Sequence, residues 1–482
     1  MIITKFGGTS VASAAAIRAT AEIVRGRLDR RPVVVVSALA GVTNALLGLA
    51  EQATAGQVLT ALHGLEGLRA RHLGEAEALL GDDGAAGLCA EVSAEISVLC
   101  DELARLLEAF SVLGHLTPRA LDAIAATGEL LAMQLVWGAY SAVGLPVAAV
   151  DPRRVLITDA TFTRAEPKPD AIAAAARQHV AALVDDGRVP VIGGFVGATA
   201  DGVTTTLGRG GSDYSASLLG AALGADAIEI WTDVDGMLTG DPRVVQGARL
   251  IERIRFDEAS ELATFGAKVL HPSTIAPAVQ RGIPVFVYNT HRPHGIGTRI
   301  TFDAPRRPVT AIAAKAPVTL LKIKSARMLL APGFLRRIFE AFERHRTSAD
   351  VVATSEVSLS VTVDRAAGHG RDTGALDALV TDLAALGDVS VEHARGVVAV
   401  VGAGLADDTR TMARALAALH GVTVHMLSLS ATELNLTAVV DADQVGSAMR
   451  RLHAEFFPVG DQVGADGELT SASTSASVAA SS

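Results

Sequence analysis

An unbroken run of valines, Val33–Val36, does most to constrain the fold of this chain. A strand with one face in water alternates apolar and polar residues, whereas an all-apolar run is typical of a parallel strand buried on both faces. Before this run come a short apolar segment at 2–6, a pair of glycines and a segment with helical spacing. Further strand-like segments, separated by helical ones, follow at 147–150, 189–192, 227–232 and 283–288. We therefore expect residues 1 to about 303 to form one α/β domain around an open, mostly parallel sheet.

Two segments interrupt or end this α/β pattern. From about residue 45 to 125 the sequence consists of long helical stretches with few strand signals, which predicts a helical insertion. The sequence Asp-Ala-Pro-Arg-Arg-Pro at 303–308 is unlike the interior of a helix or a strand, so it predicts a linker. A second domain is expected to begin at 309.

The sequence after the linker repeats one order of elements. Segments from 318 to 393 predict strand, helix, strand, strand, helix and strand, and segments from 397 to 457 repeat this order with one strand missing. A strand predicted at Thr310–Ala314 is surplus in the first copy, so we expect it to cross over and complete the second. Residues 309–457 should thus form two intertwined ferredoxin-like βαββαβ units. The stretch 458–482, rich in Ser, Ala, Thr and Gly, is expected to be disordered.

Charge and hydropathy exclude some classes of protein. The formal net charge of −10 argues against a protein that binds nucleic acid through a broad basic surface. The N-terminus lacks the long apolar segment of a secretory signal, and no run of about 18 apolar residues predicts a membrane span. We therefore expect a cytoplasmic protein with neither nucleic acid nor membrane as a partner.

The sequence Lys5-Phe6-Gly7-Gly8-Thr9-Ser10 places a lysine at the end of the first predicted strand. Its two glycines stand where the chain must turn toward a helix, and backbone N–H groups in such a loop can bind phosphate. The lysine would add a positive charge. The segment does not match the G-x-x-x-x-G-K-[ST] pattern, and an ordinary turn is the alternative interpretation.

A second glycine-rich segment, 204–213, is more informative. It brackets Arg209 with glycines and leads into a helix that begins near Ser212 and Asp213. An arginine flanked by glycines keeps its guanidinium clear of neighbouring side chains, as bidentate binding of a carboxylate requires. The alternative is a glycine-rich hairpin that only leads into a capped helix.

Polar residues after a later strand offer another possible ligand contact. Thr232 and Asp233, and further on Arg243, follow an apolar strand at the carboxyl edge of the sheet, where open α/β sheets bind ligands. A polar turn explains the same spacing equally well. The segments 127–129 (Thr-Gly-Glu) and 266–272 carry weight only together with the other motifs.

The second domain contains one misleading pattern. Gly402-Ala403-Gly404 follows a predicted strand and imitates a dinucleotide-binding fingerprint. Asp407 replaces the third glycine of that fingerprint, so we interpret the segment as a turn in the small repeated domain.

Taken together, the motifs resemble those of the aspartokinase family. The stretches 5–11, 205–213 and 264–272 read almost letter for letter like that family, in the same order, and the likeness covers essentially all of residues 1–457. It implies the three-layer amino-acid-kinase fold for the first domain and paired ACT domains for the second. Among the family's types, the chain resembles the monofunctional, lysine-sensitive one. The implied activity is transfer of the γ-phosphoryl group of ATP, with Mg²⁺, to the side-chain carboxylate of L-aspartate.

The resemblance also implies roles for residues of this chain. Lys5 would stabilise charge on the transferring phosphoryl group, and Asp213 would orient Lys5. Arg209 would bind the α-carboxylate of aspartate, and Glu129 its α-ammonium group. The rest of the implied substrate pocket is Ser37, Thr43, Phe195, Gly210, Gly211 and Ser212.

The nucleotide side of the site follows from the same resemblance. The implied contacts to ATP are Lys5, Gly7, Gly8, Thr232, Asp233, Arg243 and Lys268. Leu238 stands where some relatives place a tyrosine, so no aromatic contact to the nucleotide is implied there. The sequence does not indicate which residues would bind the metal.

An amino-acid effector is implied for the paired ACT domains, which would join at least two copies of the chain. The implied effector site is Met328, Phe334, Leu335, Ser348, Asp350, Thr354, Ser355 and Glu356. Ala331-Pro332 departs from the pattern of lysine-sensitive relatives, because it removes a hydroxyl group and a backbone donor. We expect lysine as the effector and keep threonine as the alternative.

Two other functions stay open at this point. The chain could be a kinase of another amino acid or of a nucleotide, although the combination of 127–129 with 206–213 argues against it. It could also be a catalytically silent amino-acid sensor. The presence of Lys5, Arg209 and Asp213 together argues against that second alternative.

Overall fold

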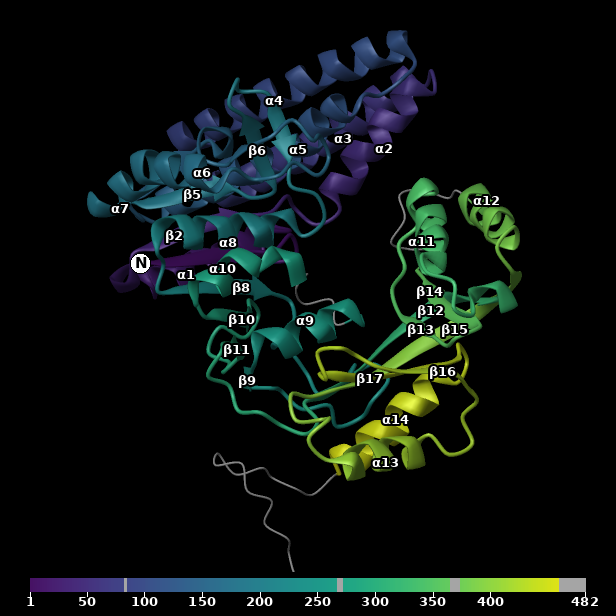
Figure 1. Cartoon of the computed structure of the whole chain (residues 1–482). Helices are drawn as coiled ribbons and strands as arrows, with labels where there is room; N and C mark the ends of the chain where they lie inside the picture. The colour runs from purple at the N-terminus through teal and green to yellow at the C-terminus, as the bar shows by residue number, and fades with distance from the viewer. Residues whose placement is uncertain (82–84, 267–271, 365–372, 459–482) are drawn as a thin grey trace, which may run out of the picture.

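The computed structural model describes residues 1–81, 85–266, 272–364 and 373–458 (Figure 1). An eight-stranded sheet lies at the centre of the first part, with the strand order β3-β5-β2-β1-β8-β10-β11-β9. Its strands pair in parallel except for β10 with β11, so the predicted mostly parallel sheet is confirmed. The strands are β1 (Ile2–Phe6), β2 (Pro32–Val36), β3 (Val147–Val150), β5 (Val189–Gly193), β8 (Ala227–Thr232), β9 (Arg253–Ile254), β10 (Val285–Asn289) and β11 (Thr298–Ile300).

The valine run of β2 shows how the three layers are held together. Val33 and Val35 pack into one hydrophobic cluster with residues of α8 and α10, whereas Val34 and Val36 pack into another with α1 and α2–α5. All four side chains are fully buried, as the all-apolar run predicts. A second, three-stranded sheet consists of β4 (Ile157–Thr158), β6 (Val196–Thr199) and β7 (Thr204–Thr206).

Helices cover both faces of the large sheet. They are α1 (Ala14–Arg25), α2 (Val42–Thr54), α3 (Val58–Leu80), α4 (Ala86–Leu113), α5 (Pro118–Ala142), α6 (Pro169–Ala176), α7 (Ala182–Asp185), α8 (Gly211–Leu223), α9 (Phe256–Thr264) and α10 (Ala276–Arg281). Of the helices in the described ranges, α5 alone is long and apolar enough to cross a membrane. It lies mostly inside the protein, with 78% of its most apolar window buried, which is typical of a core helix.

The second part of the chain forms one six-stranded sheet with the order β13-β14-β12-β15-β17-β16. Its strands are β12 (Ala311–Lys324), β13 (Val352–Thr354), β14 (Ser358–Val363), β15 (Asp388–Val401), β16 (Val424–Leu429) and β17 (Asn435–Asp441). Its helices are α11 (Phe334–Arg344), α12 (Thr373–Ala384), α13 (Thr409–Ala418) and α14 (Val445–Phe456).

The predicted crossover between the two small units is confirmed, although its strand boundaries differ. Ala311–Lys315 pairs with Val397–Val401, so this segment completes the second unit. The segments predicted as separate strands at 310–314 and 318–324 form the single strand β12, and those at 389–393 and 397–402 form β15. The two halves of β12 stay in one ladder because a register shift between Lys315 and Val318 absorbs the irregularity. The predicted boundaries at 303 and 309 stay predictions, and the predicted disorder of the tail falls almost wholly on residues outside the described ranges.

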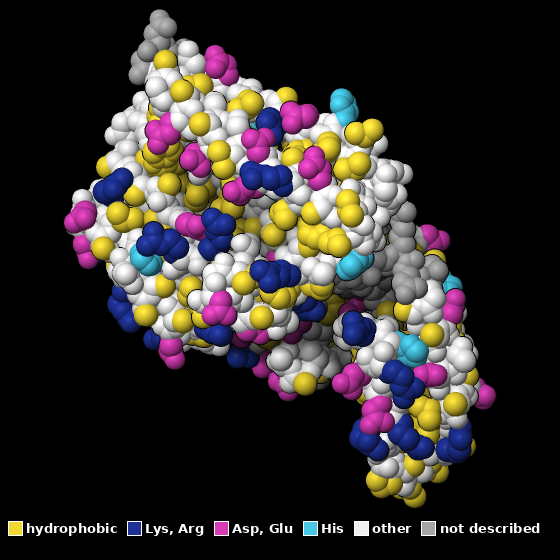
Figure 2. Space-filling model, turned by 90° about the horizontal axis from the view of Figure 1, so that it is seen from above, with side chains coloured by type: hydrophobic (Ala, Val, Ile, Leu, Met, Phe, Trp, Pro, Cys, Tyr) yellow, Lys and Arg dark blue, Asp and Glu magenta, His cyan; other side chains and the backbone are white. Residues whose placement is uncertain are grey.

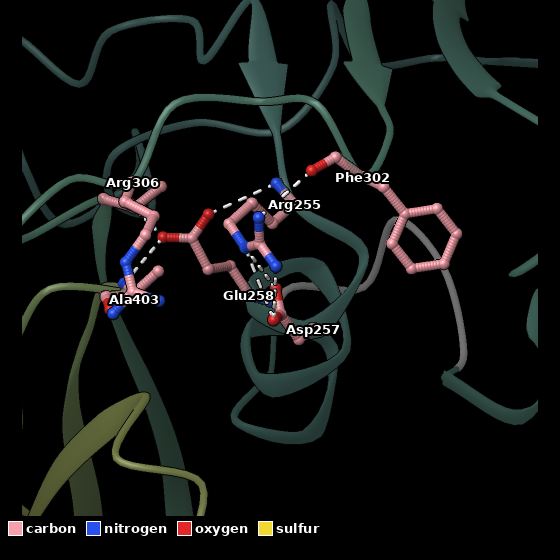
Figure 3. A network of polar contacts seen from close by, with 7 residues as sticks. Arg255, Asp257, Glu258, Phe302, Arg306 and Ala403 are labelled. Atoms are coloured by element: carbon pink, nitrogen blue, oxygen red, sulfur yellow. Dashed lines mark hydrogen bonds and ion pairs between the residues drawn. The ribbon is translucent and has the colours of Figure 1, made fainter. Parts of the chain in front are cut away.

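Helix α9 joins the two parts through the buried carboxylate of Glu258 (Figure 3). Its Oε1 atom accepts hydrogen bonds from the Thr310 hydroxyl at 2.6 Å and from the Ala403 N–H at 2.9 Å, and its Oε2 atom accepts one from the Arg255 N–H at 3.2 Å. Arg306 donates to the Ala403 carbonyl, which ties the linker to the same loop. Because Thr310 lies just after the linker and Ala403 belongs to the second small unit, one side chain of the first domain binds both segments.

Candidate active site

The carboxyl ends of β1, β2, β5 and β8 meet the start of α8 and one side of α5. Lys5 lies near the end of β1, is 8% exposed, and its Nζ atom lies 2.7 Å from Asp213 Oδ1 in the first turn of α8. A carboxylate in the first turn of a helix is favoured by the partial positive charge of the helix N-terminus. Asp213 therefore fixes the lysine ammonium group at the edge of the sheet.

Glu129 is the most perturbed group at this edge. Its side chain projects from α5 and is almost fully buried, and its Oε2 atom has no hydrogen-bond partner among the described residues. Burial raises the pKa of Glu129 to about 8, although a hydrogen bond from the Ala38 backbone and the nearby charge of Lys5 lower it. A buried carboxylate oxygen without a partner is costly, so the Oε2 atom indicates a site for a cationic ligand group.

Close backbone approach shapes the wall between β5 and α8. A Cβ atom on Gly194 would lie 2.7 Å from the Ser212 side chain, and one on Gly211 would lie 2.5 Å from the Phe195 ring. Phe195 has a φ of 63°, an uncommon left-handed conformation for a bulky residue, and its N–H donates to the Ser215 hydroxyl. Non-glycine residues held in this conformation cluster at ligand sites.

The remaining residues predicted for the substrate lie around this wall. Ser37 follows β2 and donates from its backbone to the Phe6 carbonyl, and Thr43 lies in the first turn of α2. Arg209 is exposed on the loop before α8, between Gly208 and Gly210, which both have positive φ. Of the side chains predicted to bind a zwitterion, the structure thus places Glu129 close to Lys5 and leaves Arg209 exposed on the loop before α8.

The loop after β1 packs two glycines closely beside Lys5 and the loop after β2. Gly7 donates to the Trp231 carbonyl, and a Cβ atom on Gly7 would lie 3.7 Å from the Lys5 Nζ atom. A Cβ atom on Gly8 would lie 2.8 Å from the Ala38 carbonyl oxygen, so only glycine fits there. In the described ranges no three His, Cys, Asp or Glu side chains gather so that they could hold a metal ion.

The other residues predicted for the nucleotide are less clearly placed. Thr232 ends β8 and donates to the side chain of the exposed Asp233 at 3.2 Å. Arg243 is also exposed and forms a bidentate pair with Asp241, with nitrogen–oxygen distances of 3.0 and 2.7 Å. Lys268 lies outside the described residues.

The predicted effector residues divide into two groups. The first small unit has a cavity of about 390 Å³ between the start of α11 and the hairpin that joins β13 and β14. Its lining includes Met328, Phe334, Leu335, Thr354, Ser355 and Glu356. Ser348 and Asp350 do not line it. Asp350 is instead paired with Lys315, whose Nζ atom lies 3.2 Å from Asp350 and 2.8 Å from Asp364.

Two buried polar residues were not predicted as part of the site. Ser10 donates to the Trp231 carbonyl and lies 2.6 Å from the Thr290 hydroxyl, so it fixes the loop after β1 against β8. Asp122 on α5 accepts hydrogen bonds from the Thr206 hydroxyl and the Thr163 N–H, and burial raises its pKa. Ser10 lay within the glycine motif and could have been found there, whereas Asp122 has no sequence signal.

Comparisons with known proteins agree with this geometry. Residues 1–289 match the amino acid kinase family, and residues 398–456 match an ACT domain. The lysine-sensitive aspartokinase 3 of Escherichia coli is 36% identical over 464 residues, covering 95% of this chain and 99% of that protein. Aspartokinase 1, chloroplastic, of Arabidopsis thaliana is 34% identical over 469 residues, covering 95% of this chain and 80% of that protein.

Solved structures show the same likeness in space. The crystal structure of E. coli aspartokinase III with aspartate and ADP, in its R-state, superposes with a TM-score of 0.83 at 35% identity, covering 95% of this chain and 100% of that one. The structure of the same enzyme with lysine and aspartate, in its T-state, superposes with a TM-score of 0.79 over 95% and 99% of the two chains. Because the likeness extends over both domains at this level of identity, the chain belongs to the aspartokinase family.

Proposed function

We propose that this protein is an aspartate kinase, which transfers the γ-phosphoryl group of ATP to the β-carboxylate of L-aspartate and forms 4-phospho-L-aspartate. The observation that carries the proposal is the buried Glu129 carboxylate beside Lys5, whose Oε2 atom has no hydrogen-bond partner among the described residues. An α-ammonium group is the cation that would complete this site. The related E. coli enzyme, crystallised with aspartate and ADP, supports the same pair of ligands.

The chemistry needs no general base. The β-carboxyl group of aspartate has a reference pKa of about 3.9 and is ionised at neutral pH. Catalysis must therefore come from positioning and from neutralisation of charge on the transferring group. Lys5 supplies the positive charge, and Asp213, paired with Lys5 at 2.7 Å, acts as its positioning residue and not as a proton acceptor.

The substrate is bound through its two ends. Glu129 binds the α-ammonium group, and Arg209 binds the α-carboxylate with a guanidinium that has no ion-pair partner in the described part of the chain. The other pocket residues are Ser37, Thr43, Phe195, Gly210, Gly211 and Ser212. Opposite charges at two fixed points select a zwitterion over a simple carboxylate.

The nucleotide lies against the loop after β1, with its phosphates near Lys5, Gly7 and Gly8. Thr232, Asp233, Arg243 and Lys268 complete the nucleotide contacts. Mg²⁺ is bound chiefly by the phosphate oxygens and water, as is usual for this ion, and neutralises the phosphate charge. This is consistent with the lack of an acidic metal cluster in the described ranges.

Regulation involves the cavity of the first ACT unit. We expect lysine to bind there, because the E. coli relative is lysine-sensitive and was crystallised with lysine. Threonine is the alternative, since Ala331-Pro332 lacks a hydroxyl group. The ACT units would join two or more chains, and the protein would act in the cytoplasm without nucleic acid or membrane partners.

The decisive experiment measures ADP release from ATP and Mg²⁺ with L-aspartate, L-glutamate, N-acetyl-L-glutamate or no acceptor. We expect release with L-aspartate only. Lys5→Ala should lower the rate about 10²–10³-fold, because one electrostatic donor to the transition state is lost. Lys324→Ala, at an exposed lysine of the ACT region, is the matched control. Equal ADP release with and without aspartate would leave the silent sensor as the better explanation.

A pH series tests the role of Glu129 itself. With a pKa of about 8 the free enzyme holds a neutral Glu129 at pH 7, and an ammonium group binds to the ionised form. The KM for aspartate should therefore fall as the pH rises from about 6.5 to 8.5. Glu129→Gln should raise this KM and remove its dependence on pH over the same range. A parallel pH dependence in Glu129→Gln would assign the titration to another group.

A further inference from the structure

The helical insertion has no role in the proposed function so far, but one of its side chains reaches the site. Helix α3 crosses the loops that follow β1 and β2, and Arg71 extends from it toward both. Its Nη1 atom donates to the Ala40 carbonyl at 3.2 Å, and its Nη2 atom donates to the Ala12 carbonyl at 3.3 Å. We propose that Arg71 is a positioning residue. It sets the distance between the loop after β1, assigned above to the phosphates and here called the phosphate loop, and the loop after β2, assigned to aspartate and here called the aspartate loop. This inference rests on the proposed function of these two loops.

The geometry of arginine suits this task. A guanidinium is planar and carries its donors at fixed angles, so two carbonyls bound to its two terminal nitrogens are held at a set separation. Ala12 lies just beyond the Gly7–Ser10 turn, and Ala40 lies between Ser37 and Thr43. One side chain therefore touches the backbone of both loops within a few residues of their predicted ligand contacts.

The two loops also touch each other directly at the same place. The Ala40 N–H donates to the Gly8 carbonyl at 3.1 Å, so both the N–H and the carbonyl of Ala40 are bound. The close approach of Gly8 to the Ala38 carbonyl leaves no room for a side chain between the loops. A shift of one loop must then move the other or break the Arg71 contacts.

A neighbouring contact shows that α3 is docked at this position by more than one side chain. Glu75, one helical turn after Arg71, accepts a hydrogen bond from the Ala14 N–H, the first residue of α1. A carboxylate at a helix N-terminus is stabilising, so Glu75 secures the helix into which the phosphate loop runs. Arg71 makes no ion pair in the described ranges, and its positive charge adds to the field that attracts anionic substrates.

The test compares Arg71→Ala with Arg69→Ala. Arg69 lies on the same helix but is paired within the insertion, with Glu66 and Asp101, and touches neither loop. We expect Arg71→Ala to lower kcat/KM about 10- to 100-fold, because small displacements of positioned groups carry losses of that order. Arg69→Ala should stay within about twofold of the parent, and its thermal unfolding midpoint should drop at least as much as that of Arg71→Ala.

Two further readouts separate positioning from general damage. Millimolar guanidinium should restore part of the activity of Arg71→Ala and none in Arg69→Ala. Arg71→Lys should be intermediate, since an ammonium group cannot hold both carbonyls in the planar arrangement. Activity of Arg71→Ala within twofold of the parent, or an equal loss in Arg69→Ala, would overturn the proposal.

The same variants distinguish this proposal from the proposed function. If the parent releases no ADP with aspartate, the proposed function fails, and the role of Arg71 is then decided by calorimetric titration with MgATP. If the Arg71 hydrogen bonds fix the phosphate loop, Arg71→Ala should bind MgATP more weakly than Arg69→Ala. Equal affinities would overturn it.

Discussion

The two ACT units share one order of elements but relate differently to the catalytic domain. The hydrophobic cluster around Leu321, Phe342 and Leu359 contains only residues of the first unit, whereas Val318 and Leu320 on the other face of β12 belong to the cluster of the catalytic domain. The core of the second unit includes Val245 from the catalytic domain. In Figure 1, α11 and α12 of the first unit stand apart from the catalytic domain, and Figure 2 shows a smaller lobe extending from the main body.

The polar contacts differ in the same way. Glu258 and Glu261 on α9 bind the second unit, the latter through hydrogen bonds from Asn435 and Thr432. His453 on α14 lies 2.9 Å from the Thr239 hydroxyl in the loop after β8. The first unit instead has the cavity that we propose for the effector. The polar contacts of Glu258, Glu261 and His453 thus join the second unit to the catalytic domain, while the first unit has the cavity of the proposed effector.

Glu258→Ala removes contacts that join the second unit to the catalytic domain, and we expect it to have the largest effect on stability. The substitution leaves the Thr310 hydroxyl and the Ala403 and Arg255 N–H groups without their acceptor in a buried site. Each unsatisfied buried group costs about 1–3 kcal/mol, so we expect a loss of about 3 kcal/mol or more in the free energy of unfolding. Urea unfolding followed by circular dichroism measures it.

Glu340→Ala in the first unit is the matched control. Glu340 pairs with Arg336 one turn away on the exposed face of α11, and such pairs contribute about 0.5 kcal/mol or less. If Glu258→Ala destabilises the protein no more than Glu340→Ala, the second unit is not anchored in the way described here.

Much of the fold could be predicted because periodicity is a local signal. The valine run predicted the buried central strand, and the repeated order of elements predicted the paired units. Strand ends were less predictable, because β12 and β15 continue past the points where the local pattern breaks. Their continuity depends on pairing between segments more than 60 residues apart, such as Lys324 with Asp388.

The candidate site shows the same limit. Lys5, Glu129 and Asp213 were predicted from motifs and do lie together. In the turn at Gly402-Ala403-Gly404, the Ala403 N–H donates to Glu258, and the expectation that this turn binds no dinucleotide stays a prediction. Neither this contact nor those of Arg71 has a local signal, because each joins one side chain to backbone atoms distant in the sequence.

A second prediction sharpens the difference in effector binding. Glu356 lines the cavity of the first unit, in the hairpin between β13 and β14. Glu356→Ala should raise the lysine concentration for half-inhibition about 10-fold, within the usual range of allosteric coupling, and leave the uninhibited rate unchanged. Glu433→Ala, in the corresponding hairpin between β16 and β17 of the second unit, should leave lysine inhibition as in the parent.

Lysine titrations of ADP release in the parent and both variants measure this. A larger change in Glu433→Ala than in Glu356→Ala would reverse the assignment of the two units. If lysine fails to inhibit the parent, the same series with threonine tests the alternative effector.

The smallest expected effect concerns the pH dependence of the anchored unit. Burial lowers the pKa of His453, and the nearby charge of Arg249 adds to this. The Thr239 hydroxyl accepts a hydrogen bond from the Arg249 N–H and can donate its own proton to Nε2 of a neutral His453. Acidification below the unfolded-state pKa of about 6.5 protonates the unfolded chain first, so stability should fall as the pH drops from about 6.5 toward the lower folded-state pKa.

His453→Gln removes this titration and keeps a polar group opposite Thr239. Thermal unfolding of the parent and of His453→Gln between about pH 7.5 and 5.5 should therefore show a shallower loss of stability in the variant, by about 1 kcal/mol or less. Burial also lowers the pKa of His72, but this residue is present in both proteins, so its contribution cancels in the difference. Equal slopes in the two proteins would mean that His453 titrates alike in the folded and unfolded states, and the anchored unit would then have no proton-linked contact with the loop after β8.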